Sequence, residues 1–284
     1  MIIAILANGL LPTKAEVLAY LNTAEMVVCC DGALKNYLLW LHRQSTLPHH
    51  RLAVVGDGDS LSPALLQEAA DSGIVLEHHR IPEQESNDLS KAVRFAMAAV
   101  QDANATANAA PTPQGQCCEP RPVTSKPTND GSRHDCHGDT LQVNILGATG
   151  LREDHTLGNI SLLAHYMERY PNVEFVMRSD FNTFYPMQGT RQFASEKGQQ
   201  VSLFSLTPEV PVSVSGLRYP IESRCLRSWW EGTLNEALAD TFTVARRRSG
   251  ATPSTSGRTS VSENDGIEGK SHSMRPFRSR LPGR

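Results

Sequence analysis

An apolar run ends abruptly in two aspartates in the stretch Val54-Val55-Gly56-Asp57-Gly58-Asp59-Ser60. Residues two apart in an extended chain point in the same direction, so Asp57 and Asp59 should project together from the end of a buried strand. Two carboxylates at this spacing suit Mg²⁺, which takes one or two of them and completes its shell with water and phosphate oxygens. Gly56 and Gly58 would let the backbone approach a phosphate closely. The alternative interpretation is a polar turn in which an aspartate caps a helix.

Strands and helices are expected to alternate six times around this stretch. The alternation predicts an α/β domain with a parallel, Rossmann-like sheet and helices on both faces. Asp31, Asp57 and Asp59 fall at the carboxyl ends of predicted strands, where such sheets bind their ligands. The apolar runs that predict the strands lie at 2–6, 26–30, 52–55, 74–76, 141–146 and 173–177.

Helix starts are indicated by capping residues. Thr13 and Glu16 have the spacing of a capping box, with Thr13 as the N-cap. Ser62-Pro63 places a proline at the first position of the next helix, where it is tolerated. Asn87-Asp88 opens a helix whose apolar residues recur with a period of 3.6.

Changes in composition divide the chain into three parts. Residues 1–185 are predicted to form the α/β domain, interrupted by a disordered insertion at 102–139 that has almost no large apolar side chains. Short alternating runs in 186–248 predict a smaller all-β sandwich domain. Residues 249–284 are rich in Ser, Arg and Gly and are interpreted as a disordered tail.

Charge and cysteine content narrow the class of protein. The 284 residues carry a formal net charge of −3, so the protein as a whole lacks the positive charge that attracts nucleic acid. We therefore expect no nucleic-acid partner. No apolar run reaches the roughly 18 residues that a membrane span requires, so no membrane partner is expected. The 6 cysteines do not resemble a disulfide framework. A reducing, cytoplasmic location is therefore the expectation.

Two further polar clusters follow in the sequence. Asp88 stands at a helix start, where the helix dipole favours an anion, and Gln84 precedes it. The functional interpretation makes Asp88 a third metal ligand, and the alternative is an ordinary N-cap. In the stretch 147–155, a glycine-rich loop precedes a helix and predicts an anion site. Arg152 can bind a phosphate with two hydrogen bonds, and Asp154 can face the same cleft.

In this combination the sequence resembles the thiamine pyrophosphokinases, also called thiamine diphosphokinases. The resemblance covers roughly residues 1–248 apart from the insertion, and its motifs occur in the family's order. Those motifs are Asp31-Gly32-Ala33, Gly56 to Ser60, Gln84 with Asn87 to Ala92, Gly147 to His155 with Asn159, Gly216 to Pro220, and Gly232 to Asn235.

The resemblance implies an α/β domain followed by a β-sandwich, in a homodimer with its active site at the subunit interface. It also implies a reaction in which the diphosphoryl group of ATP moves to the hydroxyl of thiamine, giving thiamine diphosphate and AMP. Mg²⁺ is the implied cofactor, and ATP and thiamine are the implied ligands.

The resemblance also assigns roles to residues of this chain. The metal ligands would be Asp57, Asp59 and Asp88, which are also catalytic candidates together with Arg152 and Asp154. Asp154 is expected to position groups or bind a ligand. The implied contacts to ATP and its phosphates are Asp31, Gly32, Gln84, Gly147, Gly150 and Arg152. The implied contacts to thiamine are Tyr219, which would stack on the ring, Thr233 and Asn235.

The chain departs from the family pattern at two of these motifs. Asn87 stands where the family usually has Thr, and Leu234 replaces the Ser of a Ser-Asn pair. Two alternatives are a non-catalytic protein that binds a nucleotide or thiamine, and a diphosphotransferase acting on another alcohol. The acidic residues argue against the first, because clustered carboxylates repel one another and a binding protein without metal has little use for them.

Overall fold

The computed structural model describes residues 1–109 and 141–246. It comprises two units, Met1–Arg191 and Gln192–Arg284, and each is described by itself. None of the helices in the described ranges is long and apolar enough to cross a membrane.

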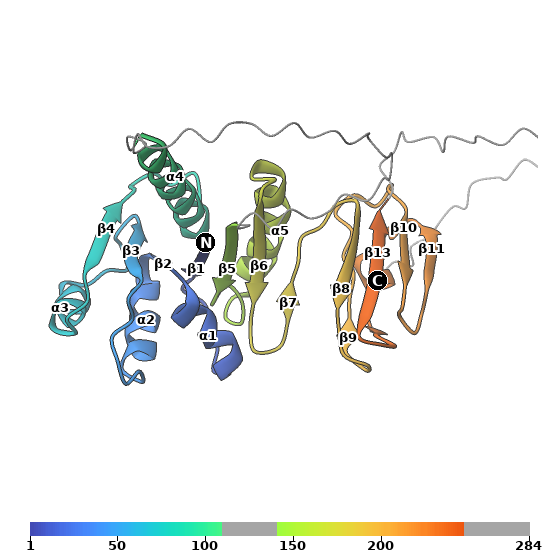
Figure 1. Cartoon of the computed structure of the whole chain (residues 1–284), viewed down its shortest axis with the longest axis horizontal. Helices are drawn as coiled ribbons and strands as arrows, with labels where there is room; N and C mark the ends of the chain where they lie inside the picture. Colours follow the sequence, from blue (N-terminus) through green and yellow to red (C-terminus); the bar gives the residue numbers. More distant parts are fainter. Residues whose placement is uncertain (110–140, 247–284) are drawn as a thin grey trace, which may run out of the picture. The chain divides into compact units, whose positions relative to one another are not determined.

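A seven-stranded sheet organises the first unit in the order β4-β3-β2-β1-β5-β6-β7, which can be followed across Figure 1. All neighbours are parallel except β6 and β7. The strands are β1 (Ile2–Leu6), β2 (Met26–Cys30), β3 (Arg51–Gly56), β4 (Leu76–Arg80), β5 (Leu141–Leu146), β6 (Val173–Arg178) and β7 (Thr183–Phe184).

Helices connect the parallel strands and cover both faces of the sheet. Because such crossovers are right-handed, the change of direction after β4 places α4 and α5 on the face opposite α1, α2 and α3. The predicted Rossmann-like sheet is thereby confirmed. The helices are α1 (Ala15–Thr23), η1 (Asp31–Ala33), α2 (Leu34–Leu41), α3 (Pro63–Asp71), α4 (Asp88–Ala109) and α5 (Glu153–Arg169).

The central strands are buried on both sides. Every residue of β2 is buried, and so are the last four residues of β1 and the last five of β3. Strands covered by helices on both faces consist of continuous apolar runs, which is why their sequences predicted them well. The carboxyl ends of these strands carry the polar loops that form the candidate site.

The predicted capping box at the start of α1 is wrong. The N-cap is Lys14, and no side chain of α1 caps it. Instead Asp180, in the loop after β6, accepts hydrogen bonds from the backbone N–H groups of Thr13 and Lys14 and from the hydroxyl of Thr13. A carboxylate near a helix start also interacts favourably with the helix dipole.

Two predicted boundaries differ from the observed ones. The strand expected at 74–76 lies at Leu76–Arg80, because it is a polar edge strand without an apolar run. Helix α4 continues to Ala109, past the expected start of the insertion at residue 102. Alternating alanines, which favour helix, extend it. The rest of the predicted insertion, and the predicted tail at 249–284, lie outside the described residues.

The second unit is the predicted all-β domain. An antiparallel sheet has the order β11-β10-β13-β8, and a second sheet pairs β12 with β9. Phe193 and Phe242 stack with ring centroids 5.2 Å apart between β8 and β13. The elements are β8 (Thr190–Ala194), β9 (Gln200–Val201), β10 (Val212–Ser215), β11 (Ile221–Arg224), η2 (Trp229–Gly232), β12 (Asn235–Glu236) and β13 (Thr241–Arg246).

Candidate active site

The loop after β3 folds back on the carboxylate of Asp57. Its Oδ1 accepts a hydrogen bond from the backbone N–H of Asp59 at 3.1 Å, and its Oδ2 accepts one from Nε2 of Gln84 at 3.3 Å. The Asp59 N–H bond is the main cause that holds the pKa of Asp57 below its ordinary value. Gly58 takes the left-handed conformation this turn needs, with φ of 86°. Asp57 is therefore ionised at neutral pH.

A buried lysine lies between two of the predicted metal ligands. Nζ of Lys91 is 3.2 Å from Oδ1 of Asp88 and 3.8 Å from Oδ2 of Asp57, and only 2% of its side chain is exposed. Burial is the main cause that raises the pKa of Asp88, and the charges of Asp57 and Asp31 add to it while Lys91 opposes it. Lys91 was not among the predicted site residues. Its spacing three residues after Asp88 was the available signal.

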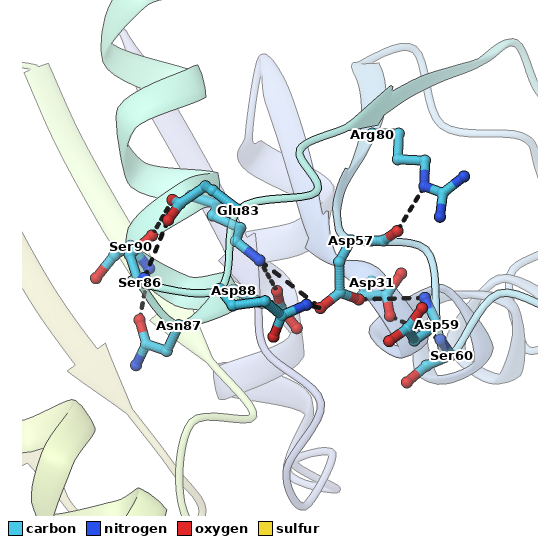
Figure 2. Close-up of polar contacts among 12 residues, drawn as sticks. Asp31, Asp57, Asp59, Ser60, Arg80, Glu83, Ser86, Asn87, Asp88 and Ser90 are labelled. Atoms are coloured by element: carbon cyan, nitrogen blue, oxygen red, sulfur yellow. Dashed lines mark hydrogen bonds and ion pairs between the residues drawn. The ribbon is translucent and has the colours of Figure 1, made fainter.

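Asp31 lies beside Asp57 (Figure 2). It is only 2% exposed, and its Oδ2 accepts a hydrogen bond from the backbone N–H of Ser60 at 2.9 Å. Its Oδ1 is buried and has no hydrogen-bond partner among the described residues. A Cβ on Gly56 would lie 2.5 Å from Cβ of Asp31, so only glycine leaves room here. Asp31 also has φ of 38°, which is a strained conformation for a residue with a side chain.

The four acidic side chains gather without forming a closed metal cage. Figure 2 shows Asp57 with Asp31 and Asp59 on one side and Asp88 on the other. Within residues 1–109 and 141–246, no group of three or more His, Cys, Asp or Glu side chains is arranged to hold a metal ion. Mg²⁺ needs only one or two carboxylates when phosphate and water supply its other ligands. The unpartnered Oδ1 of Asp31 and the partly exposed carboxylates fit that use.

Hydrogen bonds tie the start of α4 to the glycine-rich loop. Oδ1 of Asn87 accepts from the backbone N–H of Ser90 at 2.9 Å and so caps α4. Its Nδ2 donates to Oδ1 of Asn159 at 3.4 Å, and Nδ2 of Asn159 donates to the carbonyl of Ala148 at 2.8 Å. These bonds bring the second and third predicted clusters together at one edge of the sheet.

The glycine-rich loop after β5 packs closely on the loop after β1. The backbone N–H of Gly9 donates to the carbonyl of Gly147 at 2.7 Å, and that of Leu10 donates to the carbonyl of Thr149 at 3.0 Å. Gly147 and Gly150 have φ of 64° and 90°, and a Cβ on Gly150 would lie 2.8 Å from Cβ of Leu10. Glycine is therefore required at both positions. Strand order reverses direction between β1 and β5, and ligands of α/β sheets bind at such a point.

Arg152 and Asp154 form an exposed ion pair at the start of α5. Nε of Arg152 lies 3.1 Å from Oδ1 of Asp154, and Nη2 lies 2.5 Å from Oδ2. The Arg152 guanidinium holds the pKa of Asp154 below its ordinary value. Asp154 is therefore a weak proton acceptor at neutral pH, and Arg152 is held at a helix start, where anions bind favourably.

The predicted thiamine contacts lie in the second unit and differ in their exposure. The ring of Tyr219 is exposed, whereas Asn235 is buried. The hydroxyl of Thr233 donates to the carbonyl of Trp230 at 2.8 Å. The side-chain amide of Asn235 accepts a hydrogen bond from the backbone N–H of Tyr219 and donates one to its carbonyl. Of the three, Tyr219 offers the most free surface to a ligand.

Comparison with protein-family models gives two matches. Residues 17–176 match the model described as thiamin pyrophosphokinase, catalytic domain, and residues 182–249 match thiamin pyrophosphokinase, substrate-binding domain. No curated protein matches the sequence.

Solved structures share the fold at low sequence identity. Thiamin pyrophosphokinase from Candida albicans is 18% identical with a TM-score of 0.62, and the match covers 86% of this chain and 85% of that one. Thiamine pyrophosphokinase from Bacillus subtilis is 17% identical with a TM-score of 0.59, covering 87% and 94%. The yeast thiamin pyrophosphokinase is 14% identical with a TM-score of 0.57, covering 86% and 82%. At these identities the structures support the fold.

Proposed function

Because this chain belongs to the thiamin pyrophosphokinase family, we propose that it transfers the diphosphoryl group of ATP to the hydroxyl of thiamine. The thiamine oxygen forms a bond to the β-phosphorus, and the bond from that phosphorus to the oxygen bridging it to the α-phosphorus breaks. The products are thiamine diphosphate and AMP, and the hydroxyl proton is released. The observation that carries this proposal is the pair of carboxylates, Asp57 and Asp88, that Lys91 holds together at the carboxyl ends of the strands.

Mg²⁺ is the proposed cofactor, and Asp57, Asp59 and Asp88 are its proposed ligands, with Asp31 beside them. When bound, the ion would withdraw charge from the phosphate oxygens. Lys91 keeps Asp57 and Asp88 near one another by offsetting their repulsion. Gln84 fixes the orientation of Asp57 through its hydrogen bond. Positioning and electrostatics carry most of phosphoryl transfer, so such an arrangement suits the reaction.

The glycine-rich loop and the start of α5 are the proposed phosphate site. Gly147 and Gly150 keep side chains away from the loop, and Arg152 supplies a planar cation that can make two hydrogen bonds to a phosphate. Asp154 holds the guanidinium in place until a phosphate competes for it. We assign Asp154 a positioning role, because a carboxylate with a lowered pKa is a poor base.

Tyr219 is the proposed stacking partner of thiamine. A cationic thiazolium over an aromatic face gains about 0.5–2 kcal/mol. The exposed ring is available for this contact.

We also propose that the protein is a homodimer, as the family resemblance implies, and sedimentation velocity at micromolar concentration tests this.

The experiment that tests the function measures AMP and thiamine diphosphate from ATP with Mg²⁺, with and without thiamine. Equal amounts of both products, formed only with thiamine, are expected. AMP formed only with another alcohol would indicate a different diphosphotransferase. Thiamine binding in calorimetry without either product would indicate a binding protein. Arg152→Ala serves as the inactive control, since its exposed ion pair contributes little to folding.

A further inference from the structure

The side-chain amide of Asn235 is bound at both ends by the backbone of one residue. Its Oδ1 accepts a hydrogen bond from the N–H of Tyr219 at 3.0 Å, and its Nδ2 donates to the carbonyl of Tyr219 at 2.7 Å. Oδ1 also accepts from the N–H of Glu236 at 2.9 Å. Asn235 is only 4% exposed. Its amide therefore does for Tyr219 what a backbone peptide group does in a neighbouring strand.

This contact lies at the end of a short antiparallel ladder between the same two segments. The N–H of Leu238 donates to the carbonyl of Gly216 at 3.0 Å, and the N–H of Arg218 donates to the carbonyl of Glu236 at 2.8 Å. These two bonds flank the bridge between Leu217 and Ala237, and bonded and non-bonded pairs alternate along such a ladder, so it provides no backbone partner for Tyr219 at Asn235. The backbone of Asn235 pairs with Val201 of β9, and its side chain supplies the partner for the N–H and carbonyl of Tyr219.

Leu234, the residue before Asn235, has an unusual backbone conformation. It has φ of 59°, in the left-handed region that residues with side chains rarely adopt, and its side chain is exposed. Asn235 follows it and lies between two chain segments, with its backbone facing β9 and its side chain facing Tyr219. Strain at an exposed loop position is often retained for function.

The ring of Tyr219 is not held by core packing. It is 59% exposed, and the guanidinium of the neighbouring Arg218 lies 5.8 Å from its centroid. The direction in which the ring projects therefore depends on the backbone of Tyr219. The hydrogen bonds to Asn235 fix that backbone on both its N–H and its carbonyl side.

We propose that Asn235 is a positioning residue that sets the Tyr219 ring for stacking, in place of the direct pyrimidine contact that the resemblance implied. The inference rests on the proposed function, in which Tyr219 binds thiamine. It predicts a requirement for an amide, since a carboxylate would set an oxygen against the Tyr219 carbonyl and an aliphatic side chain would leave both backbone groups unpaired. Only one Nδ2 hydrogen of Asn235 remains for any other partner.

Steady-state kinetics of Asn235→Ala and Asn235→Asp test the proposal. We expect the KM for thiamine to rise roughly tenfold in both, as for loss of a well-placed contact, with the KM for ATP unchanged. Glu236→Gln is the matched control, because it changes the same strand and an exposed ion pair to Arg218 but leaves the Asn235 amide intact. An unchanged KM for thiamine in both Asn235 variants overturns the proposal. If Asn235→Ala does not fold, the nearly isosteric Asn235→Asp carries the test.

A double-mutant cycle separates positioning from direct contact. With Tyr219→Ala in place, adding Asn235→Ala should raise the KM for thiamine by less than about twofold, because the ring it positions is gone. A further rise of roughly tenfold in the KM for thiamine in the Tyr219→Ala background would mean that Asn235 contacts thiamine itself, and the proposal would be wrong.

Amide hydrogen exchange gives a readout that needs no substrate. The N–H of Tyr219 should exchange faster in Asn235→Ala than in the parent protein, while exchange in β1 to β6 stays the same. If the parent makes no thiamine diphosphate but this exchange difference is present, the proposed function fails and the positioning contact stands. If the parent is active and the exchange is unchanged, the positioning contact fails alone.

Discussion

The ammonium group of Lys91 donates a hydrogen bond to Oδ1 of Asp88 at 3.2 Å, one turn apart on α4. A pair at this spacing is usually a minor surface interaction, but here the lysine is buried. A buried ammonium is costly unless it is paired, so Lys91 must keep its carboxylate partners in the folded protein. It is thus a fixed cation between Asp57 and Asp88.

Lys91→Met should weaken both folding and turnover. The substitution leaves Asp57 and Asp88 facing one another without a cation, and we expect a loss of about 1–3 kcal/mol in unfolding free energy. The partial exposure of both carboxylates keeps the loss below that of a fully buried pair. Urea unfolding and AMP release measure the two effects, with the exposed Lys35→Met as control. Wild-type stability together with wild-type turnover would refute the role of Lys91.

Asp59→Asn should preserve the fold and abolish most turnover. The Asp59 side chain is exposed, so the unfolding free energy should change by less than about 0.5 kcal/mol. An amide is a poorer ligand for Mg²⁺ than a carboxylate, so turnover should fall by about a hundredfold or more and require more Mg²⁺. Asp71→Asn, another exposed aspartate, should behave like the parent. A variant with the parent's rate at every Mg²⁺ concentration would remove Asp59 from the metal site.

Gly150→Ala should cost more stability than Gly198→Ala. The two glycines have nearly the same φ, 90° and 91°, so the conformational cost of about 1–2 kcal/mol is shared. Only Gly150 would also place its Cβ 2.8 Å from Cβ of Leu10, whereas nothing lies within 4 Å of a Cβ on Gly198. We expect a further 1–3 kcal/mol or so at Gly150, measured by urea unfolding. Equal losses of unfolding free energy in the two variants would show that Leu10 moves away from the added Cβ without a measurable cost.

Glu77 should make folding sensitive to acid. Arg51 donates to its two carboxylate oxygens at 2.5 and 2.6 Å, and this lowers the pKa of Glu77 from 4.5 to about 2. A lowered pKa in the folded state gives stability that is complete above pH 4.5 and is lost as the pH falls toward 2. Since the pair is partly exposed, it contributes at most about 1 kcal/mol.

Comparison of the parent with Glu77→Gln over that pH range measures this contribution. The difference in unfolding free energy should be largest at neutral pH and should narrow as the pH falls from 4.5 toward 2. A difference that stays constant across the range would mean that Glu77 acts through packing and not through its charge.

The buried part of the fold could be predicted from sequence because its signal is local. Strands β1, β2 and β5 have the predicted bounds, since each is an apolar run that the sheet covers. The position of Asp57 and Asp59 at a strand end followed from the same runs. A polar edge strand such as β4 has no such signal, so the strand was predicted at 74–76 instead of at Leu76–Arg80.

Features that depend on distant partners could not be predicted in the same way. Thr13 had the sequence of a cap, but its hydrogen-bond partner Asp180 lies 167 residues later. The sequence offered no sign that Lys91 is more than an ordinary helix lysine, because its second partner, Asp57, lies on another element and is brought within 3.8 Å only by the fold. Asn235 matched a family position, yet its hydrogen bonds to Tyr219 depend on how the two segments pair. In each case the residue type was visible and the partner was not.

The central place of β1 in the sheet has a consequence for synthesis on the ribosome. Its neighbours are β2, which follows soon after, and β5, which begins only at Leu141. While residues 31–140 are being translated, one side of β1 has no strand to pair with, and its sequence is Ile2-Ile3-Ala4-Ile5-Leu6. An unpaired apolar edge of this kind is a target for aggregation. The nascent chain thus passes through a vulnerable stage whose duration is set by the length of chain between β2 and β5, and a chaperone that binds short apolar segments would act there.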